Sequence, residues 1–159
     1  MGLDQYLMAE LWFGEWTNKK SKYDDILSII GLKDEKACQY TPSLTVKVKI
    51  GYWRKANQIH KWFVDNVQNG VDNCQDFIVQ REQLEHLLTI CNSILSTKGK
   101  KKMQEKAAEL LPTSSGFFFG STDIDDWYFD DIKSTVQQLT DILNNSKFAE
   151  VEFYYRASW

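Results

Sequence analysis

The segment Leu110–Asp125, LLPTSSGFFFGSTDID, holds the densest group of residues able to contact a ligand. Three phenylalanines lie between Gly116 and Gly120, and glycine permits positive φ angles and a close approach of the backbone to another molecule. Phe117 and Phe118 offer ring surfaces, which point to opposite sides if the segment is extended. The segment therefore has two interpretations: a loop that holds a ligand, or a piece of core with a turn at each end.

The residues after Gly120 compete to cap the next helix. Ser121, Thr122 and Asp123 are all favourable caps, and Thr122 with Asp125 resembles a capping box with Asp in place of Glu. Free backbone amides beside two hydroxyl groups form a potential anion site. Carboxylates already crowd this end, at Asp123, Asp125, Asp126, Asp130 and Asp131. The alternative is therefore an acidic, self-capped helix start that repels phosphate.

A histidine lies on the apolar side of a helix predicted from about Tyr52 to Gln68. The apolar stripe of this helix consists of Ala56, Ile59, Phe63 and Val67. At helical spacing, His60 falls inside the stripe and Asn57 at its edge. A buried polar side chain needs a partner or a ligand. His60 is thus either a core histidine bonded to the backbone or a histidine that lines a pocket.

Side chains around His60 add rings, cations and a carboxylate. On the predicted helix after the loop, Asp125 shares a side with Tyr128. Its carboxylate can pair with His60 or Arg54, bond a ribose hydroxyl, or bond the loop amides. Trp53 has a core alternative, and Arg54 a solvated one. The candidate ligand-binding residues are Trp53, Arg54, Lys55, Asn57, His60, Gly116, Phe117, Phe118, Gly120, Ser121, Thr122, Asp125 and Tyr128.

Charge and motifs argue against several classes of function. The formal net charge of −3 gives no global attraction to nucleic acid or to anionic membranes. Neither G-x-x-x-x-G-K-[ST] nor G-x-G-x-x-G occurs, and the two histidines lack metal-binding spacing, so we expect no metal or cofactor. Three widely spaced cysteines, Cys38, Cys74 and Cys91, predict reduced thiols in an intracellular protein. No apolar run approaches the roughly 20 residues of a spanning helix, and we expect no signal peptide.

Periodicity predicts one α+β domain over residues 1–159, a small, mostly antiparallel sheet packed with about four helices. Strands are predicted at 3–13, 44–50 and 148–159, and residues 72–80 form a short loop or strand. The main helices are predicted at 52–68, 81–95, 103–111 and 123–145, with a short one at 24–30. Aromatic residues make up 14% of the chain, a high share that serves cores and binding surfaces alike.

Four separated strings, MGLDQYL, YWRKANQIHKWFV, LLPTSSGFFFGSTDIDDWYFDD and YYRASW, resemble a widespread family of small proteins encoded by tailed bacteriophages. The resemblance covers most of the chain. The family has no established activity, so the resemblance implies a context: a non-structural protein in the cytoplasm of an infected bacterium. Small phage proteins of this kind often resemble inhibitors of host defence. One class, the sponge, is often oligomeric and binds a nucleotide-derived immune signal without cleaving it.

Three functions follow as hypotheses. The preferred one is a binding protein that sequesters a small nucleotide-like ligand, with rings stacked on a base and polar groups holding phosphate and sugar. The second is an enzyme on such a molecule, with His60 as general acid or base and Asp125 as its orienting partner. The third is an inhibitor that docks on a host defence protein through exposed aromatic residues. For YYRASW, three roles stay open: sheet edge, oligomer contact or pocket wall.

Overall fold

The computed structural model describes residues 2–14, 17–33 and 43–159. By their contacts the residues fall into two compact units, which we call unit 1 (Met1–Ala9 with Lys49–Trp159) and unit 2 (Glu10–Val48). Strands β1 (Asp4–Phe13) and β2 (Leu44–Arg54) each pass through both units. The sequence alone predicts one domain over 1–159, with no sign of this division.

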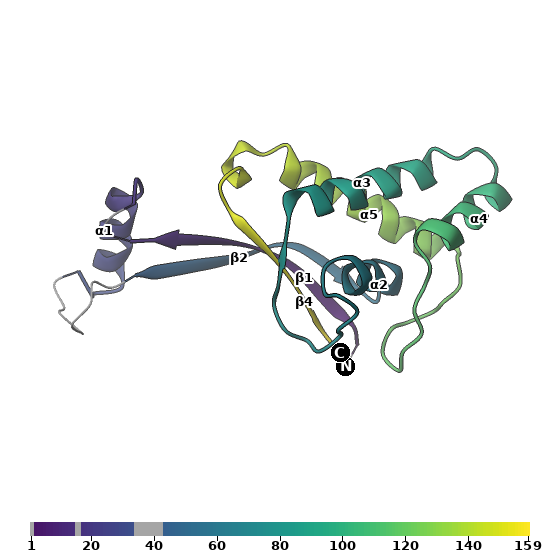
Figure 1. The fold of residues 1–159 in the computed structure, drawn as a ribbon, viewed down its shortest axis with the longest axis horizontal. Coiled ribbons are helices and arrows are strands. Elements are labelled where there is room, and N and C mark those ends of the chain that lie inside the picture. The colour runs from purple at the N-terminus through teal and green to yellow at the C-terminus, as the bar shows by residue number, and fades with distance from the viewer. Residues whose placement is uncertain (1, 15–16, 34–42) are drawn as a thin grey trace. The chain divides into compact units, whose positions relative to one another are not determined.

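The described strands form one antiparallel sheet in the order β2-β1-β4-β3, which confirms the predicted α+β class. Strands β1, β2 and β4 of this sheet are labelled in Figure 1. Strand β3 covers Phe77–Val79 and β4 covers Glu152–Ser158, and Phe77 lies opposite Tyr155 in their register. Buried and exposed side chains alternate along β4, as expected for a strand with one face on a core. Strand β3 pairs with residues 153–155 of β4, so Tyr154 and Tyr155 of the segment YYRASW lie between two strands.

Five α-helices occur within the described ranges (Figure 1). They are α1 (Lys20–Ile29), α2 (Asn57–Asn66), α3 (Arg81–Leu95), α4 (Lys100–Leu110) and α5 (Asp126–Leu143). The bounds of α3 are those predicted. Helix α4 begins three residues before its predicted start, directly after Gly99, whose φ of 94° suits glycine.

The predicted boundary between β2 and α2 is wrong. The sequence predicts a helix from Tyr52, but the strand continues to Arg54 and the helix begins at Asn57. Tyr and Trp both favour strands, and Trp53 is buried in the core with its indole donating to Thr135 at 2.9 Å. Lys55, with a φ of 59°, forms the turn between the two elements.

The core of unit 1 lies between the sheet and helices α2, α3 and α5. Strand residues Leu7 and Trp53 belong to the same buried cluster as helix residues Ile59, Leu87 and Ile132. On α5 the buried side chains recur at helical spacing, at Tyr128, Ile132, Thr135, Leu139 and Ile142. This packing fixes the strand ends and helix starts that surround the candidate site.

Unit 2 has a small apolar cluster of its own. Phe13, Tyr23 and Leu27 are buried together, with Leu44 and Val46 packed against them. Helix α1 begins at Lys20, four residues before the predicted start at Asp24. Cys38 lies outside the described residues.

Candidate functional site

Asn57 fixes the glycine-flanked loop against the start of α2. Its Nδ2 donates to the carbonyl oxygens of Phe119 at 3.1 Å and Ser121 at 2.7 Å, and its Oδ1 accepts from the amide of Ser114 at 3.0 Å. The side chain is 1% exposed. The two segments that the sequence analysis brings together therefore do meet, but both amide N–H groups of Asn57 are used by the protein itself.

A chain of buried hydrogen bonds reaches His60 from β1. The Nε2 of Gln5 donates to the carbonyl of Ala56 at 3.0 Å, so its Oε1 faces the hydroxyl of Tyr155 at 2.9 Å. Burial raises the pKa of Tyr155 well above its ordinary value, so the hydroxyl keeps its single proton. Because that proton is donated to Gln5, the Tyr155 oxygen accepts from Nδ1 of His60 at 2.8 Å.

The chain continues from His60 to Asp72 and Trp159. The Nε2 of His60 lies 2.9 Å from Oδ2 of Asp72, and the indole of Trp159 donates to Oδ1 of Asp72 at 3.1 Å. A neutral histidine has one ring proton, which here lies on Nδ1, so the contact with Asp72 requires a second proton. Whichever partner carries that proton, the pair has no net charge.

The first hollow near the loop, which we call the aromatic hollow, has a volume of about 510 Å³. Its walls are residues 114–119, His60, Lys61, Val64, Asp65, Asp72 and Trp159. Lys61 is paired with Asp65 at 2.7 Å, and His60 with Asp72, so the charged side chains of this hollow compensate one another. Such a lining suits an uncharged aromatic group better than a polyphosphate.

The three phenylalanines lie in a turn, in which the amide of Phe119 donates to the carbonyl of Gly116 at 3.1 Å. All three therefore line the aromatic hollow, whereas an extended segment would divide them between two sides. The rings of Phe119 and His60 pack edge to face, with their centroids 5.2 Å apart. The side chain of Phe117 is 94% exposed. A Cβ on Gly116 would lie 2.6 Å from the Phe119 ring, which explains why glycine stands there.

A second hollow, which we call the acidic hollow, has a volume of about 520 Å³ and lies by the start of α5. Its walls are Arg54, Lys55, Gln58, Gly120, Ser121, Asp123, Asp125, Trp127, Tyr128, Asp130 and Asp131. Four carboxylates outnumber two cations, and burial raises the pKa of Asp131. This excess of negative charge opposes phosphate binding, in agreement with the self-capped interpretation of the helix start.

The predicted capping box is wrong, because α5 begins at Asp126 and its N-cap is Asp125. The carboxylate of Asp125 accepts from the amide of Tyr128 at 3.1 Å, and the ring nitrogens of His60 contact Tyr155 and Asp72 instead. The hydroxyl of Tyr128 donates to the carbonyl of Leu111 at 2.8 Å, and burial raises its pKa. The pairing of His60 with Asp125 is therefore replaced by its pairing with Asp72.

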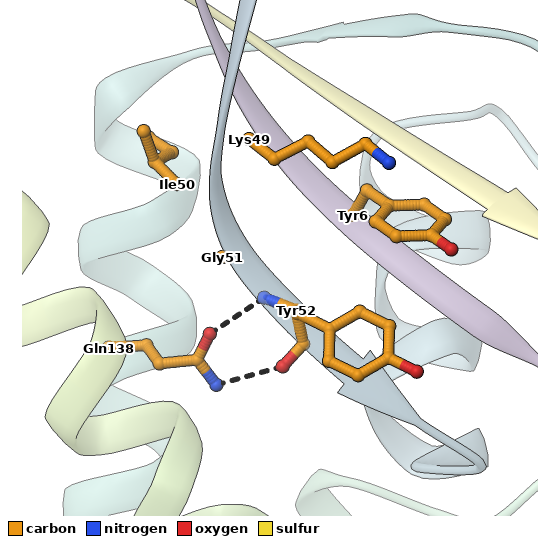
Figure 2. Close-up of a pocket in the computed structure, with 6 residues that line it drawn as sticks. All are labelled: Tyr6, Lys49, Ile50, Gly51, Tyr52 and Gln138. Atoms are coloured by element: carbon orange, nitrogen blue, oxygen red, sulfur yellow. Dashed lines mark hydrogen bonds between the residues drawn. The ribbon is translucent and has the colours of Figure 1, made fainter.

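A third hollow of about 350 Å³ lies against β1 and β2 in unit 1 (Figure 2). The ring centroids of Tyr6 and Tyr52 are 5.5 Å apart, and the amine of Lys49 lies 4.3 Å from the centroid of the Tyr6 ring. Gln138 clamps the backbone of Tyr52, accepting from its N–H at 2.8 Å and donating to its carbonyl at 3.1 Å. The hydroxyl of Tyr52 donates a hydrogen bond to Asp4, and this bond raises the pKa of Tyr52. This amide clamp satisfies part of the β2 edge.

The thirteen sequence-predicted residues are thus divided. Four line the aromatic hollow: His60, Gly116, Phe117 and Phe118. Six line the acidic hollow: Arg54, Lys55, Gly120, Ser121, Asp125 and Tyr128. Trp53 and Asn57 have structural roles, and Thr122 accepts a bond from Thr113 through its carbonyl. The most important omission is Asp72, which lies in a polar loop without a local motif.

Trp159 shows that the pocket-wall interpretation of YYRASW holds for the aromatic hollow. Within the described ranges, no three His, Cys, Asp or Glu side chains are placed to hold a metal ion together. None of the helices in that part of the chain is long and apolar enough to cross a membrane. Comparisons of the chain with protein-family models, curated proteins and solved structures gave no match.

Proposed function

We propose that this chain is a bacteriophage protein that binds a small nucleotide-derived ligand in the aromatic hollow and sequesters it from host defence. The observation that carries the proposal is the joining of exposed rings and a fixed polar pair in one hollow. Phe117 and Trp159 are 94% and 45% exposed, and His60 and Asp72 lie beside them. A base stacked on such rings gains roughly 1–3 kcal/mol.

The charge balance of the aromatic hollow implies different positions for the base and for the phosphate groups of the ligand. The compensated pairs of the hollow accept an uncharged base without a large electrostatic cost. Phosphate groups then face solvent near the hydroxyls of Ser114 and Ser115 and the amine of Lys61. The acidic hollow does not serve phosphate, because its four carboxylates repel it.

Binding without conversion is favoured over catalysis by the state of His60. Its side chain is 1% exposed, and both ring nitrogens are occupied, by Tyr155 and by Asp72. A general acid or base must reach a substrate proton directly or through one water molecule. His60 has no free nitrogen for that task, so a ligand is expected to leave the protein unchanged.

A second function is supported by the exposure of two aromatic side chains, Phe117 at 94% and Trp127 at 80%. Exposed aromatic side chains are frequent anchors of protein interfaces. Under this second function, the chain docks directly on a host protein through these exposed aromatic side chains. Small-molecule binding and docking are separable, because only the first requires the interior walls of the hollow.

The test is isothermal titration calorimetry with a panel of cyclic dinucleotides, mononucleotides and ADP-ribose. We expect saturable heat for at least one compound, and chromatography of the ligand released by heating should recover it intact. The Phe117→Ala variant should bind it about tenfold more weakly, since a lost stacking contact costs on the order of 1–3 kcal/mol. No heat across the panel, together with capture of a host protein that depends on Phe117, would favour docking.

A further inference from the structure

We propose that Asp72 determines the specificity of the aromatic hollow and selects a base that offers two adjacent N–H donors, as guanine does. This inference rests on the proposed function and names the ligand class of the same hollow. It starts from the hydrogen bonds that hold Asp72, the group the sequence analysis did not identify.

The protein uses one acceptor position on each oxygen of Asp72. Oδ2 faces Nε2 of His60 at 2.9 Å, and Oδ1 accepts from the indole of Trp159 at 3.1 Å. A carboxylate has about four lone-pair positions, so one remains on each oxygen. The side chain is 26% exposed and lines the hollow, so a ligand in the hollow can reach its carboxylate.

The orientation of the carboxylate is fixed before a ligand arrives. His60 is held from behind by Tyr155, whose hydroxyl is in turn held by Gln5, and both of these residues are fully buried. A preorganised acceptor pair does not lose side-chain entropy on binding, which is how a site gains discrimination. The inference requires the ionic form of the pair, in which the second proton lies on His60 and both Asp72 oxygens are acceptors only.

Guanine matches this acceptor pair because its N1–H and its 2-amino group point in parallel toward one edge. A carboxylate accepts such a pair of donors in bidentate fashion. Adenine offers one amino donor beside a ring nitrogen with a lone pair, which would face a carboxylate oxygen and repel it. Hypoxanthine keeps N1–H but lacks the amino group, and is the closest probe of the second bond.

The substitution Asp72→Asn separates specificity from folding. The amide is the same shape, its Nδ2 donates to the lone pair that Nε2 of a neutral His60 carries, and its Oδ1 still accepts from Trp159. The internal chain of hydrogen bonds therefore survives in this variant. What the variant loses is the second acceptor toward the hollow, because an N–H group now stands where Oδ2 stood.

The experiment compares GMP, IMP and AMP by calorimetry on the wild type and on Asp72→Asn, with urea unfolding to verify the fold of the variant. We expect the wild type to bind GMP about tenfold more tightly than IMP, and AMP more weakly still, from the loss of one charge-assisted bond. In Asp72→Asn the affinity for GMP should fall about tenfold or more, because one of guanine's two donors then faces an N–H group instead of an acceptor.

Two results overturn the inference while leaving the proposed function in place: equal binding of GMP and IMP by the wild type, or tighter binding of AMP than of GMP. Undiminished binding of GMP by Asp72→Asn also overturns it, because other groups then accept the two donors of guanine. If neither these nucleotides nor the wider panel of cyclic dinucleotides and ADP-ribose binds, the proposed function itself fails.

Discussion

His60 and Asp72, twelve residues apart in the sequence, are in contact at 2.9 Å between Nε2 and Oδ2. The proton count follows from the other side of the ring, where Tyr155 accepts from Nδ1 because it donates its own hydroxyl proton to Gln5. A single chain of bonds thus connects β1, β4, α2 and the loop that carries Asp72. The interior of the sheet therefore sets the orientation of a group in the aromatic hollow.

The two variants Asp72→Ala and Asp72→Asn should differ in stability. Alanine leaves the buried Nε2 of His60 without a partner, which costs on the order of 1–3 kcal/mol. Asparagine restores a donor to that nitrogen and should stay within about 1 kcal/mol of the wild type. Urea unfolding followed by circular dichroism measures both free energies. Equal loss in the two variants would contradict the proton assignment.

Asn57→Ala should loosen the loop as well as destabilise the fold. The substitution removes three hydrogen bonds to Ser114, Phe119 and Ser121 from a buried side chain, at a cost of about 2–4 kcal/mol. Amide hydrogen exchange over residues 114–121 should accelerate in step with the loss. Asn66→Ala is the matched control, since its side chain donates to the carbonyl of Trp62 within α2, and the loop should exchange in this variant at the wild-type rate.

Phe117→Ala should affect binding and leave stability unchanged. A ring that is 94% exposed contributes little to folding, so the free energy of unfolding should change by less than about 0.5 kcal/mol. The Kd for the ligand identified by calorimetry should rise about tenfold. Trp127→Ala, an exposed aromatic residue of the acidic hollow, should leave the Kd unchanged. Weaker binding by Trp127→Ala, with unchanged binding by Phe117→Ala, would instead place the ligand in the acidic hollow.

The thiol of Cys91 should make the protein less stable at high pH. Burial raises its pKa from 9.0 to about 12. Because the folded state holds the proton more tightly, this contribution to stability is complete below pH 9 and is lost as the pH rises toward 12. Relative to Cys91→Ala, wild-type stability should fall above pH 9 with a slope approaching about 1.4 kcal/mol per pH unit. If the free energies of unfolding of the two proteins changed in parallel between pH 8 and pH 10.5, the raised pKa of Cys91 would be refuted.

The sequence predicts much of this fold where periodicity is long and unbroken. The range of α3 and the inward position of His60 both follow from helical spacing alone. The junction of β2 and α2 does not, because Tyr52 and Trp53 satisfy both a helical and a strand pattern. Only the packing of Trp53 into the core decides between them.

The candidate site is less predictable than the fold, for a reason seen in the partners of His60. The sequence offers Asp125 as a partner because it is a carboxylate on the inward side of a predicted helix. The chain uses Asp125 to cap that helix and brings Asp72 from an irregular loop instead. Loop positions have no periodicity from which a direction can be inferred. The hydrogen bond between Asp72 and Trp159 joins residues 87 positions apart in the sequence, so it depends wholly on the order of the strands.

The most direct measurement of the central claim is a ¹H–¹⁵N NMR titration with the nucleotide that calorimetry identifies. The indole signal of Trp159 is assigned through Trp159→Phe, and mass spectrometry follows the ligand in the same tube. We predict that this indole signal and the amides of residues 114–119 shift to saturation while the mass of the ligand stays constant. Saturable shifts confined to Trp127 or Tyr52, or a change in the mass of the ligand, would contradict the account.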